Sequence, residues 1–258
     1  MFKLMYTDRF DKNNYEFNAE NETGIYLIHG FSSSTYEMKS LAKFLDSKKF
    51  HVILNNLPGH GTTIEECNRV QFSDWLDATK KDLAILSSQS KKIYIIGCSM
   101  GGLIALYLAS IFPVNGVIVG GLVMQFKKPF MTNVVNTLFC RILKTSDKKN
   151  NFDPNIRKKI NFYGYDKYPL IALNEFRKMI KFIKPKLKNI KSPILLIHSY
   201  SDLTSIEENV FLAKKLINNN LLEIFTVNDA HHNLFDINPN QKQIFKKISE
   251  FLDIDSKR

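Results

Sequence analysis

Residues 92–102 read KIYIIGCSMGG, and this stretch decides how the rest of the chain is interpreted. The apolar run 92–97 predicts a buried strand, and residues 103–112 have the pattern of a helix. Between them, the segment from Gly97 to Gly101 matches G-x-S-x-G in the strand-turn-helix context that this pattern requires. The glycines leave room for a sharp turn that lifts the hydroxyl of Ser99 above the sheet edge, at the positive end of a helix. Ser99 is therefore the candidate nucleophile.

The rest of the chain alternates apolar strand-like runs with helical patterns. Strand-like runs occupy residues 24–31, 51–55, 114–120, 193–198 and 221–227, and helical patterns occupy 35–47, 72–86, 206–217 and 240–252. Strands that are apolar on both faces and separated by helices predict an α/β fold with a mostly parallel sheet and helices on both faces. Residues 125–191 interrupt this rhythm, with three helix-like stretches and no convincing strand. We expect them to form a helical cap inserted into a core of residues 1–124 and 192–258.

A serine hydroxyl is a weak nucleophile, so it needs a base that is oriented by an acid. Asp202 follows the strand-like run 193–198, and the neighbours His231 and His232 follow the run 221–227. Both loops lie at the carboxyl ends of predicted parallel strands, where α/β sheets place their sites. The end of the run 114–120 offers no acid. The pattern therefore predicts Asp202 as the orienting carboxylate and a histidine at 231 or 232 as the base.

Two backbone N–H groups are needed to stabilise an oxyanion next to the serine. One is expected from Met100, which follows the nucleophile, and the other from Phe31 in the loop His29-Gly30-Phe31. We expect His29 to brace this loop by hydrogen bonds. The six histidines lack the spacing of a zinc site and no glycine-rich phosphate loop occurs, so neither a metal nor a cofactor is expected.

Several short motifs together carry a family resemblance. The motifs are HGF at 29–31, GHG at 59–61, GCSMGG at 97–102, SYSD at 199–202 and AHHNLFD at 230–236. With them, residues 24–252 resemble small bacterial carboxylesterases and monoacylglycerol lipases of the α/β-hydrolase superfamily. Members of this family carry the catalytic histidine five residues before an acidic residue. Because His231 precedes Asp236 by five, the resemblance favours His231 over His232 as the base. Two departures could reshape the pocket: Ala230 replaces the usual glycine, and Ser199-Tyr200 replaces a small residue.

The resemblance implies an α/β-hydrolase fold with a short cap and a Ser-His-Asp acyl-enzyme mechanism. The expected substrates are short- to medium-chain acyl esters or monoacylglycerols. A lysophospholipase or acyl thioesterase acting on anionic lipids is the alternative. A non-catalytic binding protein is disfavoured because the sequence retains a serine, an acid and a histidine at the positions of a catalytic triad. Within the cap, residues 129–143 place apolar side chains at helical spacing, either to pack on the core or to line an acyl pocket over Ser99.

Positive charge is concentrated in the cap. Residues 127–191 hold 17 Lys and Arg against four acids, whereas the remainder holds 19 basic and 21 acidic residues, for a net charge of +11. Basic segments attract anions, but no nucleic-acid-binding module is recognised. The remaining interpretations are a bias in composition or peripheral contact with an anionic membrane through Lys127, Lys128, Lys144, Lys148 and Lys149. The sequence shows neither a signal peptide nor an apolar run of 18 residues, and its three cysteines are an odd number. These features predict a cytoplasmic protein.

Overall fold

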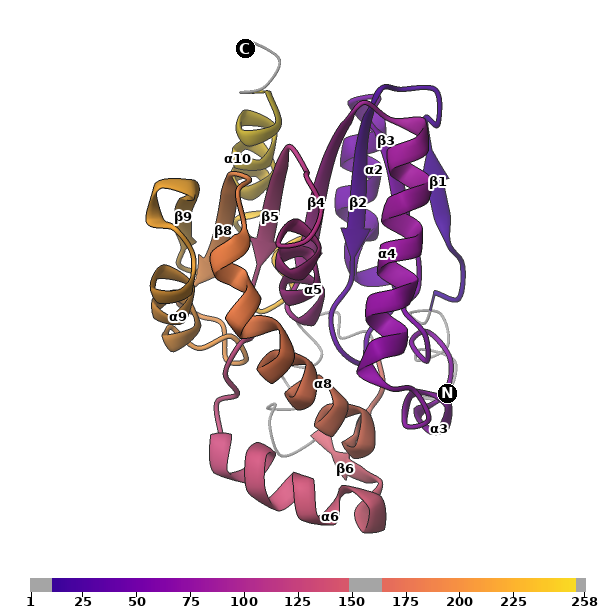
Figure 1. Cartoon of the computed structure of the whole chain (residues 1–258), viewed down its shortest axis with the longest axis vertical. Coiled ribbons are helices and arrows are strands. Elements are labelled where there is room, and N and C mark those ends of the chain that lie inside the picture. The colour runs from indigo at the N-terminus through magenta and orange to yellow at the C-terminus, as the bar shows by residue number, and fades with distance from the viewer. Residues whose placement is uncertain (1–10, 149–163, 254–258) are drawn as a thin grey trace.

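A seven-stranded sheet forms the centre of the computed structural model, which describes residues 11–148 and 164–253 (Figure 1). Its strand order is β1-β3-β2-β4-β5-β8-β9. The strands are β1 (Tyr15–Phe17), β2 (Thr23–Ile28), β3 (His51–Leu54), β4 (Lys92–Cys98), β5 (Gly116–Gly120), β8 (Ile194–Ser199) and β9 (Leu222–Val227). Strand β1 pairs antiparallel with β3, and the other neighbours pair parallel. The prediction of a mostly parallel sheet is confirmed.

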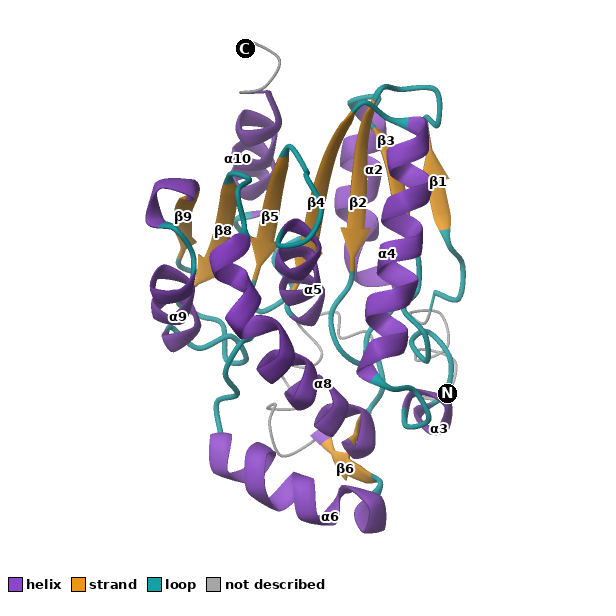
Figure 2. Cartoon of the chain, in the orientation of Figure 1, coloured by secondary structure: helices purple, strands orange, loops and turns teal. Residues whose placement is uncertain are grey.

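Helices cover both faces of this sheet, as Figure 2 shows. One face carries α4 (Phe72–Gln89), α5 (Met100–Ala109), α8 (Leu170–Ile183) and α9 (Glu208–Leu216), and the other carries α2 (Lys39–Ser47) and α10 (Gln241–Asp253). Helix α5 is buried at every position and so lies at the centre of its layer. The shorter helical elements are η1 (Thr35–Met38), α3 (Ile64–Cys67), η4 (Lys184–Asn189) and η5 (Asn219–Leu221).

The alternation of side chains along each strand divides the core into two layers. In β2, Tyr26 and Ile28 join the layer under α4 and α5, whereas Ile25 and Leu27 join the layer under α2 and α10. This alternation follows from the period of two in a strand, and both faces are apolar because both are covered. Because β4, β5, β8 and β9 pair parallel, the carboxyl ends of β4, β8 and β9 lie at one edge of the sheet.

The predicted cap contains a pair of short strands that the sequence pattern does not reveal. Strand β6 (Thr145–Asp147) pairs antiparallel with β7 (Lys167–Pro169), beside η2 (Met131–Val135) and α6 (Asn136–Leu143). The expectation of no strand here is wrong, because three-residue strands of largely polar composition show no apolar alternation. Helix α8 runs from the cap onto the core, where Phe176, Met179 and Ile183 are buried. The division into core and cap remains a prediction.

Helix α6 buries only a polar and a small residue and exposes its large apolar residues. The buried positions are Asn136, whose side-chain amide donates to the carbonyl of Leu170 at 3.0 Å, and Cys140. The exposed large side chains of η2, of α6 and of the residue before η2 are Phe130, Met131, Val134, Leu138, Phe139, Ile142 and Leu143. We expected these side chains either to pack on the core or to line an acyl pocket. Because they are exposed, they do neither. Within residues 11–148 and 164–253, none of the helices combines the length and apolar character that a bilayer crossing demands.

Candidate active site

The turn between β4 and α5 presents Ser99 as a nucleophile elbow would. Its φ is +54°, a left-handed conformation that is uncommon for a residue with a side chain. A Cβ atom at Gly97 would lie 2.3 Å from the carbonyl oxygen of Gly101, and one at Gly101 would lie 2.2 Å from that of Ile28. Both positions therefore require glycine. The N–H of Ser99 donates to the carbonyl of Gly120 at 2.8 Å, which ties the elbow to the neighbouring strand β5.

A buried carboxylate holds an imidazole at the same edge of the sheet. Nδ1 of His232 lies 2.7 Å from Oδ2 of Asp202, whose side chain is fully buried. The other carboxylate oxygen accepts the N–H groups of Thr204 at 2.7 Å and Ser205 at 2.9 Å. Burial raises the pKa of Asp202, but the charge of His232 and these three hydrogen bonds outweigh it and lower that pKa below its usual value. The aspartate is thus held as an anion.

The partner of Asp202 is His232, and this corrects the expectation that His231 is the base. The side chain of His231 is exposed, whereas His232 is only 21% exposed and faces inward. A tight turn, in which the N–H of Leu234 donates to the carbonyl of His232 at 3.0 Å, sets which side chain points into the site. The spacing of five residues between His231 and Asp236, which favoured His231, does not take this turn into account. Asp236 instead accepts the hydroxyl of Ser40 at 3.0 Å.

Gly121 makes room for the imidazole. A Cβ atom there would lie 3.2 Å from Cε1 and Nδ1 of His232. The preceding residue, Gly120, accepts the N–H of Ser99 through its carbonyl. Gly120, the last residue of β5, therefore contacts the elbow, and Gly121, the next residue, lies against the histidine. Burial lowers the pKa of His232, but the charge and hydrogen bond of Asp202 and the charge of Glu37 raise it above its usual value.

The loop after β2 fixes the peptide unit that carries the N–H of Phe31. Leu57 donates its N–H to Nε2 of His29 at 3.0 Å, so the proton of this imidazole resides on Nδ1. Nδ1 then donates to the carbonyl of Gly30 at 2.9 Å. Burial lowers the pKa of His29 to about 4, so the ring is neutral at pH 7. Since the Gly30 carbonyl and the Phe31 N–H belong to one planar unit, His29 braces the loop as predicted.

The second predicted donor is the N–H of Met100. Met100 is the first residue of α5, and the first N–H groups of a helix have no partner within it. They point out of the end that carries positive partial charge. Ser99 thus lies at the turn after β4, Met100 at the start of α5 and Phe31 in the loop after β2, while Asp202 contacts His232 and not His231. The catalytic roles of these residues remain predictions.

Two contributions to this site went unnoticed in the sequence. Glu37 in η1 is 4% exposed, and its carboxylate accepts the N–H of Gly30 at 2.5 Å. From the cap, Lys148 donates to the hydroxyl of Ser32 at 2.7 Å, and Tyr165 donates its N–H to the carbonyl of Ser32 at 3.0 Å. An acid within an otherwise helical apolar pattern is the one signal that could have indicated Glu37. The cap contacts carry no such signal.

A nucleophile elbow at the carboxyl edge of a mostly parallel sheet, with a carboxylate and a histidine supplied after β8 and β9, defines an α/β hydrolase. The chain belongs to the family described as serine aminopeptidase, S33 (Hydrolase_4), whose model matches residues 19–236. The predicted superfamily is confirmed.

Several similar proteins are named as lipases or lipolytic enzymes. A thermostable monoacylglycerol lipase from Bacillus sp. (strain H-257) is 27% identical over 248 residues, which cover 91% of this chain and 92% of that protein. The monoacylglycerol lipase of Paleococcus ferrophilus has a TM-score of 0.71 at 18% identity, over 94% of this chain and 98% of the other. A metagenome-derived lipolytic enzyme has a TM-score of 0.79 at 18% identity, over 93% and 96%. The chain is thus an α/β hydrolase of the lipase and esterase type.

Proposed function

We propose that the chain hydrolyses carboxylic esters through Ser99, His232 and Asp202, with short- to medium-chain acyl esters or monoacylglycerols as substrates. The observation that carries this proposal is the 2.7 Å contact between a buried aspartate and an imidazole beside a glycine-lined serine elbow. The names of the similar proteins support lipids as the substrate class.

The proposed reaction is two-step acyl transfer. Nε2 of His232 takes the hydroxyl proton of Ser99 while that oxygen attacks the ester carbonyl carbon, and the N–H groups of Phe31 and Met100 stabilise the oxyanion. As the ester C–O bond breaks, His232 gives its proton to the leaving alcohol. Water then attacks the acyl-enzyme with His232 again as the base, and the acid is released. Asp202 stays ionised throughout and stabilises the imidazolium.

A panel of substrates tests this proposal. It comprises monoacylglycerols and p-nitrophenyl esters of graded chain length, a lysophospholipid, an acyl thioester and an aminoacyl amide. We expect the highest kcat/KM on a monoacylglycerol or short- to medium-chain ester, and loss of both turnover and fluorophosphonate labelling in Ser99→Ala. A preference for the thioester, the lysophospholipid or the amide would replace the proposed substrate class.

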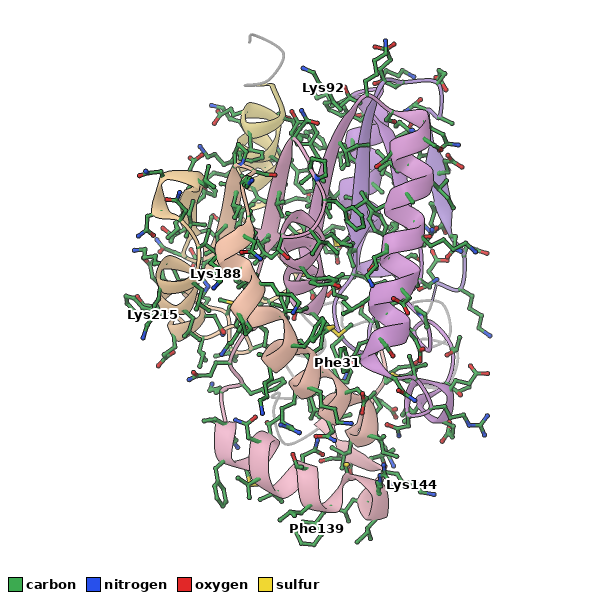
Figure 3. The ribbon with its side chains drawn as sticks, viewed as in Figure 1. Phe31, Lys92, Phe139, Lys144, Lys188 and Lys215 are labelled. Atoms are coloured by element: carbon green, nitrogen blue, oxygen red, sulfur yellow. The ribbon has the colours of Figure 1, made fainter. Side chains whose placement is uncertain are left out.

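We further propose that the cap contacts an anionic membrane in a peripheral manner. The most exposed apolar side chains along η2 and α6 and at the residue before η2 are Phe130, Leu138 and Ile142, at 68%, 67% and 74% exposure. Inserting each into lipid contributes about 1.5–3 kcal/mol, and each nearby Lys or Arg adds about 1 kcal/mol at an anionic surface. Lys127 and Lys128 precede this apolar face, and Arg141 and Lys144 lie at its end; Figure 3 shows Phe139 and Lys144 at the outer edge of the cap.

One member of the predicted lysine set has a different role. Lys148 is 3% exposed and donates to Ser32, so it is not available to a membrane surface. Lys149 lies outside the described residues. The cations that remain for membrane contact are those at the two ends of the apolar face.

Vesicle co-sedimentation tests the membrane contact. Leu138→Ser combined with Ile142→Ser should reduce binding to vesicles containing anionic lipid, and Lys127→Gln with Lys144→Gln should reduce it more at low salt than at high salt. The matched control is Phe211→Ser, which removes a side chain of 58% exposure on α9 and should leave binding unchanged. Concentration-dependent self-association that the serine substitutions abolish, without vesicle binding, would assign this face to a second copy of the chain instead.

A further inference from the structure

Glu37 is a buried carboxyl group that the proposed mechanism does not use. It lies in η1, and its Oε2 accepts the N–H of Gly30, the residue before the expected oxyanion donor. A Cβ atom at Gly30 would lie 3.1 Å from this oxygen and 3.2 Å from Cβ of Ser99. The Gly30 backbone thus lies between the carboxylate and the nucleophile, where a side chain would fit only if these neighbours moved slightly.

Glu37 and His29 together hold both polar ends of Gly30. The carboxylate of Glu37 accepts its N–H, and Nδ1 of His29 donates to its carbonyl. Two consecutive peptide planes are thereby fixed, and the second of them carries the N–H of Phe31. An oxyanion donor is effective only when its direction is set before the reaction, because reorganisation then costs nothing in the transition state.

Glu37 also acts on the histidine through charge. The titratable groups around His232 are Asp202 from the β8–α9 loop, Glu37 from η1, and His198 at the end of β8. Asp236 and Cys98 interact in turn with Glu37. The pKa of Glu37 is raised above its usual value, because burial and the charge of Asp236 outweigh the N–H of Gly30 and the charge of His232, which lower it. The negative charge of Glu37 raises the pKa of His232, and so it adds to the stabilisation of the imidazolium that Asp202 provides.

We propose that Glu37 is a positioning residue of the esterase site, which aims the Phe31 N–H through Gly30 and supports the protonated form of His232. This inference rests on the proposed ester hydrolysis. It differs from a purely structural role, because a carboxyl group that only filled space would affect stability without affecting the histidine or the transition state.

Two substitutions separate the hydrogen bond from the charge. Glu37→Gln keeps an oxygen that can accept the N–H of Gly30 but removes the charge that supports the imidazolium, so kcat should fall, but by less than in Glu37→Ala. Since the pKa of His232 should fall, the acidic limb of the kcat/KM profile should move to lower pH. Glu37→Ala removes the acceptor as well, and kcat should fall on the order of 10²-fold with KM little changed. Asp82→Asn is the control, because that carboxylate accepts the buried hydroxyl of Tyr26 at 2.8 Å away from the site.

An NMR titration keeps this proposal distinguishable from the proposed function. In the Ser99→Ala background, the imidazole of His232 should titrate at lower pH after Glu37→Gln and at unchanged pH after Asp82→Asn. If no ester is hydrolysed but this shift occurs, the proposed reaction fails while the charge coupling stands. If the profile and the titration of Glu37→Gln coincide with those of the unsubstituted protein, and Glu37→Ala lowers only the melting temperature, Glu37 is structural and the inference is overturned.

Discussion

Asp202→Asn should inactivate the enzyme by changing which nitrogen of His232 carries the proton. Oδ1 of Asp202 accepts two backbone N–H groups, so the amide oxygen of an asparagine should take that place. The reverse orientation would set the amide nitrogen against both N–H groups and lose two hydrogen bonds, at about 2 kcal/mol, a roughly thirtyfold disadvantage. The favoured orientation points the amide nitrogen at Nδ1 of His232, 2.7 Å away in the unsubstituted protein. Nδ1 must then accept, and Nε2 carries the proton.

A histidine in this tautomer cannot accept the proton of Ser99, so kcat should fall about 10⁴-fold. The assay is hydrolysis of a short-chain p-nitrophenyl ester, with the melting temperature measured to confirm folding. Asp236→Asn is the matched control in the histidine loop, since its carboxylate bonds to Ser40 and not to the imidazole, and most activity should remain. Retention of more than about a tenth of the activity in Asp202→Asn would refute the role of the carboxylate in setting the tautomer.

Four further outcomes are expected. Ser99→Ala should abolish fluorophosphonate labelling at an unchanged melting temperature, and persistent labelling would reassign the nucleophile. His232→Ala should lose several powers of ten in kcat while His231→Ala keeps most of it; the reverse would restore the spacing argument. Gly101→Ala should prevent stable folding, because the added methyl group would lie 2.2 Å from a carbonyl oxygen of β2, and a melting temperature within a few degrees would contradict this. Burial lowers the pKa of His60 from 6.5 to about 3, so the unfolded state binds more protons and stability should fall as pH decreases from 6.5 towards 3. Urea titrations should show a shallower fall in His60→Phe.

The elements most readily predicted were those buried on both faces of the sheet. The predicted strands at 51–55 and 193–198 match β3 and β8 within one residue at each end. A short continuous apolar stretch bounded by polar residues is typical of a buried strand. Helix α5 begins at Met100, three residues earlier than its apolar pattern indicated, because the glycines of the elbow interrupt that pattern. The strands β6 and β7 were missed because their pairing is local and their residues carry no periodicity.

The positions of the candidate residues at the strand ends could be predicted from the sequence, except for the register of the histidine loop. The positions of Ser99 and Asp202 could be predicted because the first directly follows β4 and the second lies in the short loop after β8, and both strands are recognisable in the sequence. Choosing between His231 and His232 depends on backbone direction in a turn, which residue spacing does not specify. Glu37 was missed for a related reason: its hydrogen bond to Gly30 joins two loops whose closeness depends on how η1 packs beneath the sheet edge.

The site is assembled from distant parts of the chain, and this has a consequence for how activity returns during refolding. Phe31, Ser99, Asp202 and His232 follow β2, β4, β8 and β9, so the first and last of them are about two hundred residues apart. Contacts between remote segments form late, because closing long loops costs entropy before the contacts are gained. Helices are local and form early. In a refolding experiment, ester hydrolysis should therefore lag behind the helical circular dichroism signal, and enzyme turnover reports completion of the sheet rather than collapse of the chain.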